Sequence, residues 1–399
     1  MTLLALFIGL VFVYSLVSAR LEATVLTAPM LFTLAGLGLA LLQPALGDAP
    51  VGREVFLRAA EAGLVLLLFT DASRTELQVL RRARSLPARL LSVGLLLTLL
   101  LGTLGARVIF PRLSFLEAGI LASVLAPTDA GLGQIIVASA KVPARVRQAL
   151  NVEAGLNDGL SVPFLLFFLA LAEARIPDAH VLFGRFMLEQ LGYGTLIGAA
   201  IGLAGGWALA AASRGKSMSP AFLQIAVVAL PLLCALASEA AGASMFIAAF
   251  VAGLAVQVRF PEAGKHSVEF TEEWGQLINL GIFFIFGVLV ARSWHGVTAP
   301  MLLYAVFSLT VARMLPVALS LIGAGLARST VAFMGWFGPR GLASIVLAMV
   351  YLEADLHLPG EDTIRLTVLA TVMLSILAHG LTARPGIDRY AAALGAREA

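Results

Sequence analysis

Residues 151–161 read NVEAGLNDGLS and lie inside an apolar segment that continues to about Ala172. Two acids and an amide, Glu153, Asp158 and Asn157, therefore fall within one stretch long enough to cross a bilayer. A charged side chain at the centre of a membrane helix costs about 2.5 to 3.5 kcal/mol on insertion scales, so each acid needs a partner or a function there. Helical spacing puts Glu153 and Asn157 on one face and turns Asp158 about 100° away, so the acids need not share one partner.

The composition places the whole chain in a membrane. Hydrophobic residues make up 60% and charged residues 13% of the 399 residues, whereas soluble domains have about 45–50% and about 25%. The single cysteine, Cys234, excludes an internal disulfide, and no Cys/His cluster predicts a metal centre, so we expect no cofactor. The net charge of +3 comes from basic residues gathered in particular loops, which indicates membrane topology and not binding to nucleic acid.

Thirteen apolar segments are long enough to span a bilayer, which takes about 17 to 25 residues each. They predict an all-α polytopic membrane protein in which the first segment is a retained helix, since no basic residue precedes it. Their approximate extents are Thr2–Ser18, Thr24–Leu42, Val55–Thr70, Leu90–Phe110, Leu113–Ala138, Val146–Ala172, Phe183–Ala212, Pro220–Ala237, Ser244–Val258, Glu273–Ala291, Ala299–Leu326, Thr330–Leu352 and Thr363–Ala383.

Basic residues favour alternate connections between these segments, as the positive-inside rule requires of cytoplasmic loops. The rich connections hold Arg20, Arg74, Arg81, Arg82, Arg84, Arg89, Lys141, Arg145, Arg147, Arg214, Lys216, Arg259, Lys265, Arg328, Arg384, Arg389 and Arg397. The other connections are poorer and include the acidic stretch from Glu353 to Asp362. We therefore expect the N-terminus outside and the C-terminus in the cytoplasm.

Thirteen segments divide into six, one linker and six, which predicts two inverted repeats: residues 1–175, a linker helix at 182–212, and residues 219–384. The fifth segment contains APTDAGLG at 126–133, and the twelfth, seven segments later, contains GWFGPRG at 335–341. Both are interrupted by Gly and Pro around a charge. Interrupted helices at matching places in two halves are typical of a transporter's binding site, where freed backbone groups line a cavity or are buried in protein.

These features together resemble the sodium/proton exchangers, and most closely the NhaP-type, electroneutral branch of the cation/proton antiporter superfamily. The motifs are Thr128-Asp129 in the broken fifth helix, Glu153 with Asn157-Asp158 in the sixth, Arg313 in the eleventh and residues 338–341 in the twelfth. The resemblance covers nearly the whole chain and includes FTDA at 69–72, AAFVAGL at 248–254 and SILAHG at 375–380.

The resemblance implies an antiporter that exchanges a monovalent cation, Na⁺ in the first place, for a proton, with membrane lipid around it. It implies a homodimer in the bacterial inner membrane. Helices 1–3 and 8–10 would form a static dimer interface, and helices 4–6 and 11–13 a core that moves like an elevator, with helices 5 and 12 crossing at its centre.

Asp158 is the residue at which we expect cation and proton to compete, because one carboxylate can hold a proton or a small cation but not both. Hard oxygen ligands suit such cations, so the resemblance adds Asp129 and Thr128 to the cation and proton site. Asp129 has an alternative use, since it could instead serve the positive end of a half-helix. Asn157 is placed in the same cation and proton site; it supplies an amide without a second titrating charge and is expected to hold helices 5 and 6 together.

Glu153 requires a buried counter-charge, and Arg313 and Arg340 are the two arginines predicted at membrane depth. The family pattern favours Arg313 as its partner and leaves Arg340 to balance the half-helix ends of the twelfth helix. Asp71, at the cytoplasmic end of the third helix, resembles the family's acidic residue on the cation path. A solvated loop charge is the alternative for Asp71.

The chain departs from the family pattern at two positions. Ala130 stands where the family commonly has Pro, although Pro127 and Gly131 can still break the helix. Ala154 stands where the family commonly has Ser, a cation-ligating hydroxyl, which leaves the choice between Na⁺ and K⁺ open. A K⁺/H⁺ antiporter is therefore the nearest alternative, and a cation channel a further one, since acidic rings and broken helices also occur in pores. An intramembrane enzyme is disfavoured, because no nucleophile is matched with a base and no metal-binding spacing is present.

Overall fold

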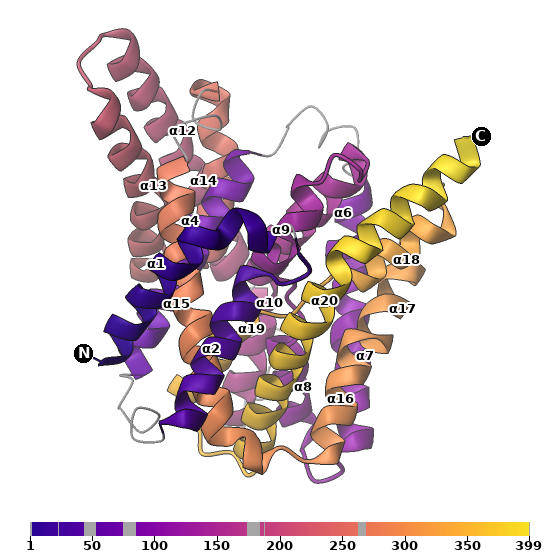
Figure 1. Ribbon diagram of the computed structural model, residues 1–399. Helices are drawn as coiled ribbons and strands as arrows, with labels where there is room; N and C mark the ends of the chain where they lie inside the picture. Colours follow the sequence, from indigo (N-terminus) through magenta and orange to yellow (C-terminus); the bar gives the residue numbers. More distant parts are fainter. Residues whose placement is uncertain are drawn as a thin grey trace.

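The computed structural model describes residues 2–22, 24–43, 53–74, 85–173, 184–186, 188–261 and 269–398. These residues form helices and connections, with no β-strand among them (Figure 1). Arg81, Arg82, Arg84 and Lys265, used above to orient the chain, lie outside the described residues, as does the start of the predicted linker at 182–183.

The first half of the chain contains the helices up to α10. They are α1 (Thr2–Glu22), α2 (Ala28–Leu42), α4 (Arg53–Ser73), α6 (Ser85–Arg89), the π-helix η1 (Leu90–Gly94), α7 (Leu95–Ile109), α8 (Phe115–Val124), α9 (Ala130–Ala138) and α10 (Ala144–Glu173). The fifth predicted segment is thus two short helices, α8 and α9, separated by five residues.

The second half begins with a π-helix and ends with the longest helix of the described chain. It comprises η2 (Leu188–Tyr193), α12 (Gly194–Arg214), α13 (Pro220–Ala240), α14 (Met245–Arg259), α15 (Glu269–Ser293), the 3₁₀-helix η4 (Trp294–Gly296), α16 (Ala299–Leu309), α17 (Val311–Ser320), α18 (Arg328–Trp336), α19 (Leu342–Glu353) and α20 (Glu361–Glu398). The twelfth predicted segment is likewise broken, into α18 and α19.

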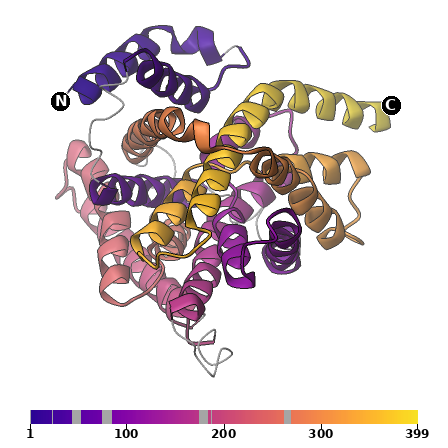
Figure 2. The ribbon, with the colours of Figure 1, turned by 90° about the horizontal axis from the view of Figure 1, so that it is seen from below.

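Most predicted boundaries shift by a few residues, and two elements differ in a way that changes the helix itself. The segment expected as one helix at 299–326 is divided at Thr310, whose hydroxyl donates to the carbonyl of Val306 at 2.6 Å. Such a side-chain bond competes with the backbone ladder and bends helices. The last helix was expected to end at Ala383 but continues to Glu398, with Pro385 in its interior. Figure 2 shows α20 passing across the bundle and ending at the periphery.

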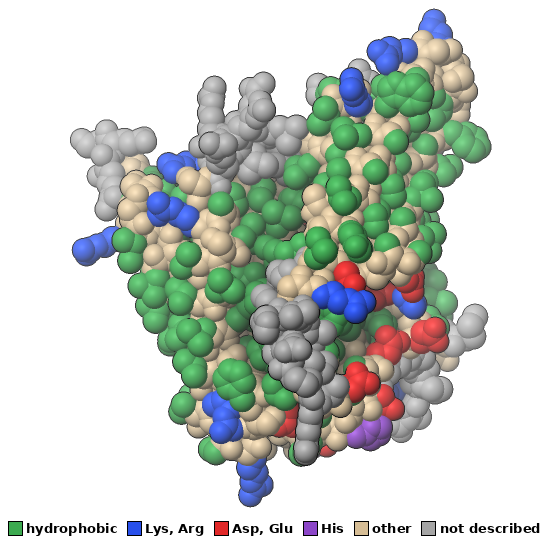
Figure 3. Space-filling view, turned by 180° about the vertical axis from the view of Figure 1, so that it is seen from behind, with side chains coloured by type: hydrophobic (Ala, Val, Ile, Leu, Met, Phe, Trp, Pro, Cys, Tyr) green, Lys and Arg blue, Asp and Glu red, His purple; other side chains and the backbone are tan. Residues whose placement is uncertain are grey.

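Eight stretches of the described chain are long and apolar enough to cross a membrane by length and composition. The apolar helices α2, α8, α14 and α19 are shorter than a bilayer requires. Large apolar side chains of α1, α7 and α13, among them Phe12, Leu100 and Phe222, are exposed on the outside. Figure 3 shows hydrophobic side chains over much of one face, with Lys and Arg mainly toward its ends.

The helices pack as two groups. In the first, called the α15 group, α15 packs against α2 and α4, and α14 packs against α4, α12 and α13; α1 joins it through Phe7, whose ring meets that of Phe284. In the second, the crossing group, α8 packs against α7 and α10, α17 against α18, and α20 against α16. Helix α10 contacts α14, so the two groups meet along it.

Glycine brings backbones into contact inside the α15 group. A Cβ on Gly36 of α2 would lie 2.0 Å from the carbonyl oxygen of Phe284, and one on Gly287 of α15 would lie 2.0 Å from that of Thr33. Neither distance leaves room for a methyl group. Small residues allow such close approach of membrane helices, whose association depends on packing and not on a hydrophobic driving force.

Candidate functional site

Two broken helices meet at the centre of the crossing group. Helix α8 ends at Val124 and α9 begins at Ala130, while α18 ends at Trp336 and α19 begins at Leu342. We call residues 125–129 the first break and residues 337–341 the second break. The backbone N–H of Asp129 donates to the carbonyl of Pro339 at 2.8 Å, which joins the two breaks directly. Pro127 and Pro339 supply no N–H, so a continuous helix would lose a backbone hydrogen bond at both places.

The carboxylate of Asp129 caps two helices at once. Its Oδ1 accepts from the N–H of Leu132 at 3.1 Å in the first turn of α9, and its Oδ2 accepts from the N–H of Leu342, the first residue of α19. The positive ends of both helices therefore point at one anion. A Cβ on Gly341 would lie 2.0 Å from Oδ2, so only glycine admits the carboxylate there.

This geometry agrees with the alternative that the sequence left open for Asp129, at the positive end of a half-helix. Its side chain is 6% exposed, and both oxygens already accept hydrogen bonds. A carboxylate oxygen can still accept further donors or a cation, since it has two lone pairs. Asp129 thus caps two half-helices, and its oxygens keep lone pairs for a further ligand.

Arg340 lies in the second break and reaches the first. Its side chain is fully buried, and its Nη1 donates to the carbonyls of Ala126 and Pro127 at 2.7 and 2.8 Å. Those carbonyls lie just after α8, so the cation neutralises the negative end of that helix. We expected Arg340 to balance the ends of its own helix; because the breaks cross, the nearest free carbonyls belong to α8 instead.

His379 contacts the remaining half-helix end, the C-terminal end of α18. Its Nε2 lies 2.9 Å from the carbonyl of Trp336, the last residue of α18, and its Nδ1 lies 3.0 Å from the carbonyl of Ser375. Its Nδ1 lies 3.1 Å from the hydroxyl of Ser375, which in turn accepts from the N–H of Arg340 at 2.6 Å. The sequence analysis assigned no role to His379. The signal that could have indicated one is a polar residue in an apolar helix, four residues after Ser375.

Thr128 and Asn157 join the first break to α10. Asn157 donates from Nδ2 to Oγ1 of Thr128 at 2.7 Å and accepts from the N–H of Thr128 at 3.3 Å. The amide is therefore engaged at both ends by one residue. This pair holds the first break against the helix that carries Asp158.

Asp158 is held quite differently. It is 2% exposed, and its Oδ1 has no hydrogen-bond partner in the part of the chain that the structure describes. An uncompensated buried carboxylate is unfavourable unless a proton or a cation neutralises it.

The structure brings Glu153 and Arg313 together as a buried ion pair. Nη1 of Arg313 donates to Oε1 of Glu153, Nη2 donates to Oε2 at 3.0 Å, and both side chains are about 95% buried. Nη2 also lies 3.4 Å from the carbonyl of Met334 in α18. A Cβ on Gly338 would lie 2.2 Å from Nε of Arg313, so the glycine of the second break makes room for the guanidinium.

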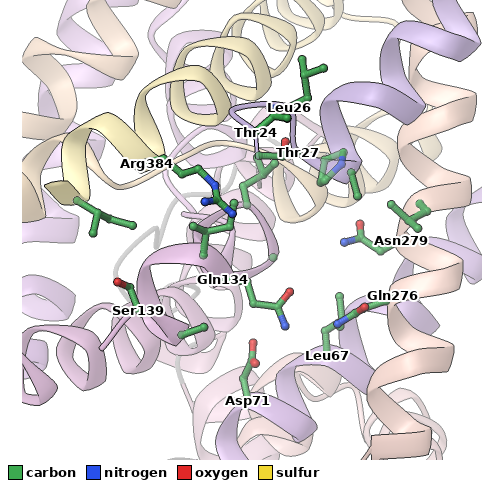
Figure 4. Close-up of a pocket in the computed structure, with 18 of the residues that line it drawn as sticks. Thr24, Leu26, Thr27, Leu67, Asp71, Gln134, Ser139, Gln276, Asn279 and Arg384 are labelled. Carbon is green, nitrogen blue, oxygen red and sulfur yellow. Dashed lines mark hydrogen bonds between the residues drawn. The ribbon is translucent and has the colours of Figure 1, made fainter. Parts of the chain in front are cut away.

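Asp71 lies on a cavity of about 860 Å³ between the two helix groups. Its walls include Leu67 and Asp71 of α4, Gln276 and Asn279 of α15, and Gln134 of α9 (Figure 4). The rest of the lining includes Thr24, Thr27, Ser139, Lys141, Arg384 and Asp388, from the α1–α2 and α9–α10 connections and from α20 beyond Ala383. The cavity thus opens at the end of the molecule where the sequence gathers basic residues.

Gln134 of the cavity wall also contacts α15. Its Nε2 donates to Oε1 of Glu272 at 2.8 Å, and Arg74, the residue that follows α4, forms an ion pair with the same carboxylate. Among the residues that the structure describes, no group of three or more His, Cys, Asp or Glu side chains is arranged to hold a metal ion.

A family described as "Sodium/hydrogen exchanger, transmembrane" matches residues 4–387. The chain belongs to the sodium/hydrogen exchanger family. The K(+)/H(+) antiporter NhaP of Alkalimonas amylolytica is 27% identical over 388 residues, which cover 95% of this chain and 65% of that protein. A Na(+)/H(+) antiporter of Schizosaccharomyces pombe is 26% identical over 263 residues, covering 61% of this chain and 56% of that protein. This exchanger-family chain spans about half to two thirds of the length of these relatives.

A solved structure has the same fold. The sodium proton antiporter MjNhaP1 of Methanocaldococcus jannaschii superimposes with a TM-score of 0.76 at 20% identity, covering 98% of this chain and 99% of that chain. The resemblance to NhaP-type exchangers that the sequence predicted is confirmed by the family match. The chain is an integral membrane protein, helical in fold over the residues that the structure describes, and its family membership implies a transporter.

Proposed function

We propose that this exchanger-family protein is a secondary antiporter that exchanges one monovalent cation for one proton across the membrane. The observation that carries the proposal is the carboxylate of Asp158, buried with an oxygen that no described group satisfies. A proton or a small cation would each complete it, and only one can do so at a time.

The balance of buried charge supports a single exchangeable site. Asp129, Glu153 and Asp158 meet Arg313 and Arg340 at the crossing, so the ionised cluster carries one net negative charge. Glu153 is held by Arg313 and Asp129 by two helix ends. One monovalent cation or one proton on Asp158 therefore neutralises the cluster, which a buried site requires.

Around Asp158, we propose that the cation is held by oxygens and not by a second free acid. Thr128 keeps a hydroxyl beside Asn157, and backbone carbonyls of the breaks supply further hard ligands. Asp129 stabilises the crossing and lends its negative charge to the site. Asp71, on the cavity wall, attracts the cation on its way in.

We propose the architecture that follows for transport. Thirteen membrane spans form two inverted repeats, residues 1–175 and 219–384, joined by the linker helix at 182–212, with α8–α9 and α18–α19 as corresponding broken helices. Helices α1, α2 and α4 together with α13, α14 and α15 form a static homodimer interface. The crossing group, which carries Asp158, moves relative to that interface. The cavity's basic-rich mouth favours a cytoplasmic opening, with the N-terminus outside and the C-terminus inside a bacterial inner membrane.

The cargo is proposed as Na⁺, with K⁺ as the alternative. Similar proteins include both a K(+)/H(+) antiporter and a Na(+)/H(+) antiporter. Ala154 supplies no hydroxyl, so a candidate ligand that would distinguish Na⁺ from K⁺ is missing at this position. A channel is less favoured, because a pore does not require a buried acid to change its occupant.

The test is proton movement in proteoliposomes that contain the purified protein and an internal pH dye. Addition of Na⁺, Li⁺ or K⁺ in turn should release protons for at least one cation, while Asp158→Asn protein and protein-free liposomes give none. Cation flux that is independent of any proton gradient would indicate a channel and refute the proposal.

A further inference from the structure

Asn279 lies in the middle of α15, between Ile278 and Leu280, in a helix that is otherwise apolar at this depth. Its side chain is 6% exposed, and its Oδ1 has no hydrogen-bond partner among the described residues. A buried amide oxygen without a hydrogen-bond donor is unfavourable. The cost is higher in a bilayer, because no water is available there to donate to the oxygen. A polar residue kept at this place needs a reason beyond packing.

The amide faces the first break across Gly131. A Cβ built on Gly131 would lie 3.2 Å from Nδ2 of Asn279 and 3.1 Å from Oδ1 of Asp129. Any larger side chain at 131 would therefore stand between the amide and the carboxylate. Asn279 belongs to the α15 group and Gly131 to the crossing group, so this approach joins the two groups at the level of the site.

The same amide lines the large cavity. Asn279 and Asp71 are both part of its wall, with Gln276 one turn from Asn279 toward the mouth, and Figure 4 shows the Asn279 amide directed into the space. Asp158 does not line this cavity, but Gly131 and Leu132 do, and they follow Asp129 closely in the first turn of α9. Asn279 therefore lies on the cavity wall beside the broken helix that carries Asp129.

We infer that Oδ1 of Asn279 is a ligand for the transported cation as it passes from the cavity to Asp158. A monovalent cation loses water at this point, and an amide oxygen is the hard, neutral ligand that replaces a water without holding the ion permanently. The inference rests on the proposed antiport.

The ligand comes from the helix group that does not carry Asp158. When the crossing group moves, Gly131 and Asp158 leave Asn279 behind, and the oxygen no longer contributes. Asn279 therefore assists binding from one face of the membrane only, the face onto which the cavity opens.

The experiment compares the apparent cation KM from both faces, in everted and in right-side-out membrane vesicles. Asn279→Leu keeps the size of the side chain and removes the oxygen. We expect its KM to rise about tenfold from the cytoplasmic face, as for the loss of one favourable polar contact, and to stay within about twofold from the other face. Asn279→Ala decides by the same criterion if the leucine variant does not accumulate in the membrane.

Gln276→Leu is the matched control. Gln276 lines the same cavity from the same helix, but its Nε2 donates to Glu272 at 3.1 Å, so its amide is already engaged. We expect its KM to stay within about twofold of the wild type on both faces.

Three results would overturn the inference: an unchanged KM in Asn279→Leu, an equal rise on both faces, or an equal rise in Gln276→Leu. The wild type is measured first in the same vesicles. Failure of the wild type to move protons with any cation would refute the antiport itself, and that outcome is distinct from an unaffected variant in an active transporter.

Discussion

Asp129 and Asp158 lie almost equally deep in the crossing group, at 6% and 2% exposure, yet their carboxylates are held differently. Each oxygen of Asp129 accepts from an N–H at the start of a helix, α9 for one and α19 for the other. Oδ1 of Asp158 has no hydrogen-bond partner among the described residues. The two side chains have the same chemistry and similar burial, and they differ in the hydrogen bonds that their carboxylate oxygens accept.

The difference separates structural acids from exchanging acids. N–H donors at helix ends stabilise a carboxylate as an anion and are always present. A carboxylate with an unsatisfied oxygen depends on a proton or a cation that arrives and leaves. Burial alone therefore does not distinguish the two acids, and the hydrogen bonds around each of them do.

The largest effect is expected for Asp158→Asn. The amide is close in size to the carboxylate but can neither titrate nor neutralise a cation, so exchange should fall by at least about 100-fold, or about 2.7 kcal/mol. Cation-driven proton release in proteoliposomes measures it. Thermal unfolding in detergent should show a folded protein, and full exchange by such a well-folded variant would remove Asp158 from the site.

The next largest effect concerns Glu153 and Arg313. Removal of one partner leaves an uncompensated buried charge, which costs about 3 to 5 kcal/mol of stability. Glu153→Ala and Arg313→Ala should each lower the thermal stability markedly, and the double variant should lose less than the sum of both. Additive losses would show that the pair is not coupled, and coupling of Glu153 to Arg340 instead would reassign the partner.

A smaller effect is expected for Asp129→Asn. The amide keeps one acceptor but presents its NH₂ to an N–H of a helix end, so about 1 to 3 kcal/mol of stability should be lost. Exchange should slow while apparent cation affinity changes little. Asp129→Asn should therefore destabilise more, and inhibit less, than Asp158→Asn. A stable Asp129→Asn variant without activity would place Asp129 among the cation's ligands and erase the contrast.

Much of this site was predictable, because its residue types are costly in a membrane. Glu153, Asp158 and Arg313 stand out in any apolar segment, and the Gly/Pro-rich runs at 126–133 and 335–341 predict breaks that the helix boundaries confirm. The sequence could also pair Glu153 with an arginine from charge balance alone. These inferences need only the local cost of charge and of an interrupted helix.

Contacts between distant segments were not predictable. Arg340 was expected to serve its own helix and contacts Ala126 instead, because only the crossing brings the end of α8 within reach. The second cap of Asp129, on Leu342, depends on the same crossing. His379 and Asn279 were missed for a related reason: one polar residue in an apolar helix says nothing of which carbonyl or cavity it will face.

The last prediction uses the contrast to fix the charge moved per cycle. If Asp129 remains an anion bound to two helix ends and Glu153 remains paired, Asp158 alone changes its occupant. It then crosses the membrane neutralised once by a cation and once by a proton, so exchange is one for one and electroneutral. A membrane potential is imposed on proteoliposomes with a K⁺ gradient and valinomycin during Na⁺/H⁺ exchange.

We expect no change in rate or in the final gradients under that potential. Each elementary charge moved is worth about 2.3 kcal/mol per 100 mV, so an electrogenic cycle would respond strongly. Gradients that shift with the potential would mean that a second acid titrates. Asp129 is the first suspect, and restoration of voltage independence by Asp129→Asn would identify it, because the amide cannot take up a proton.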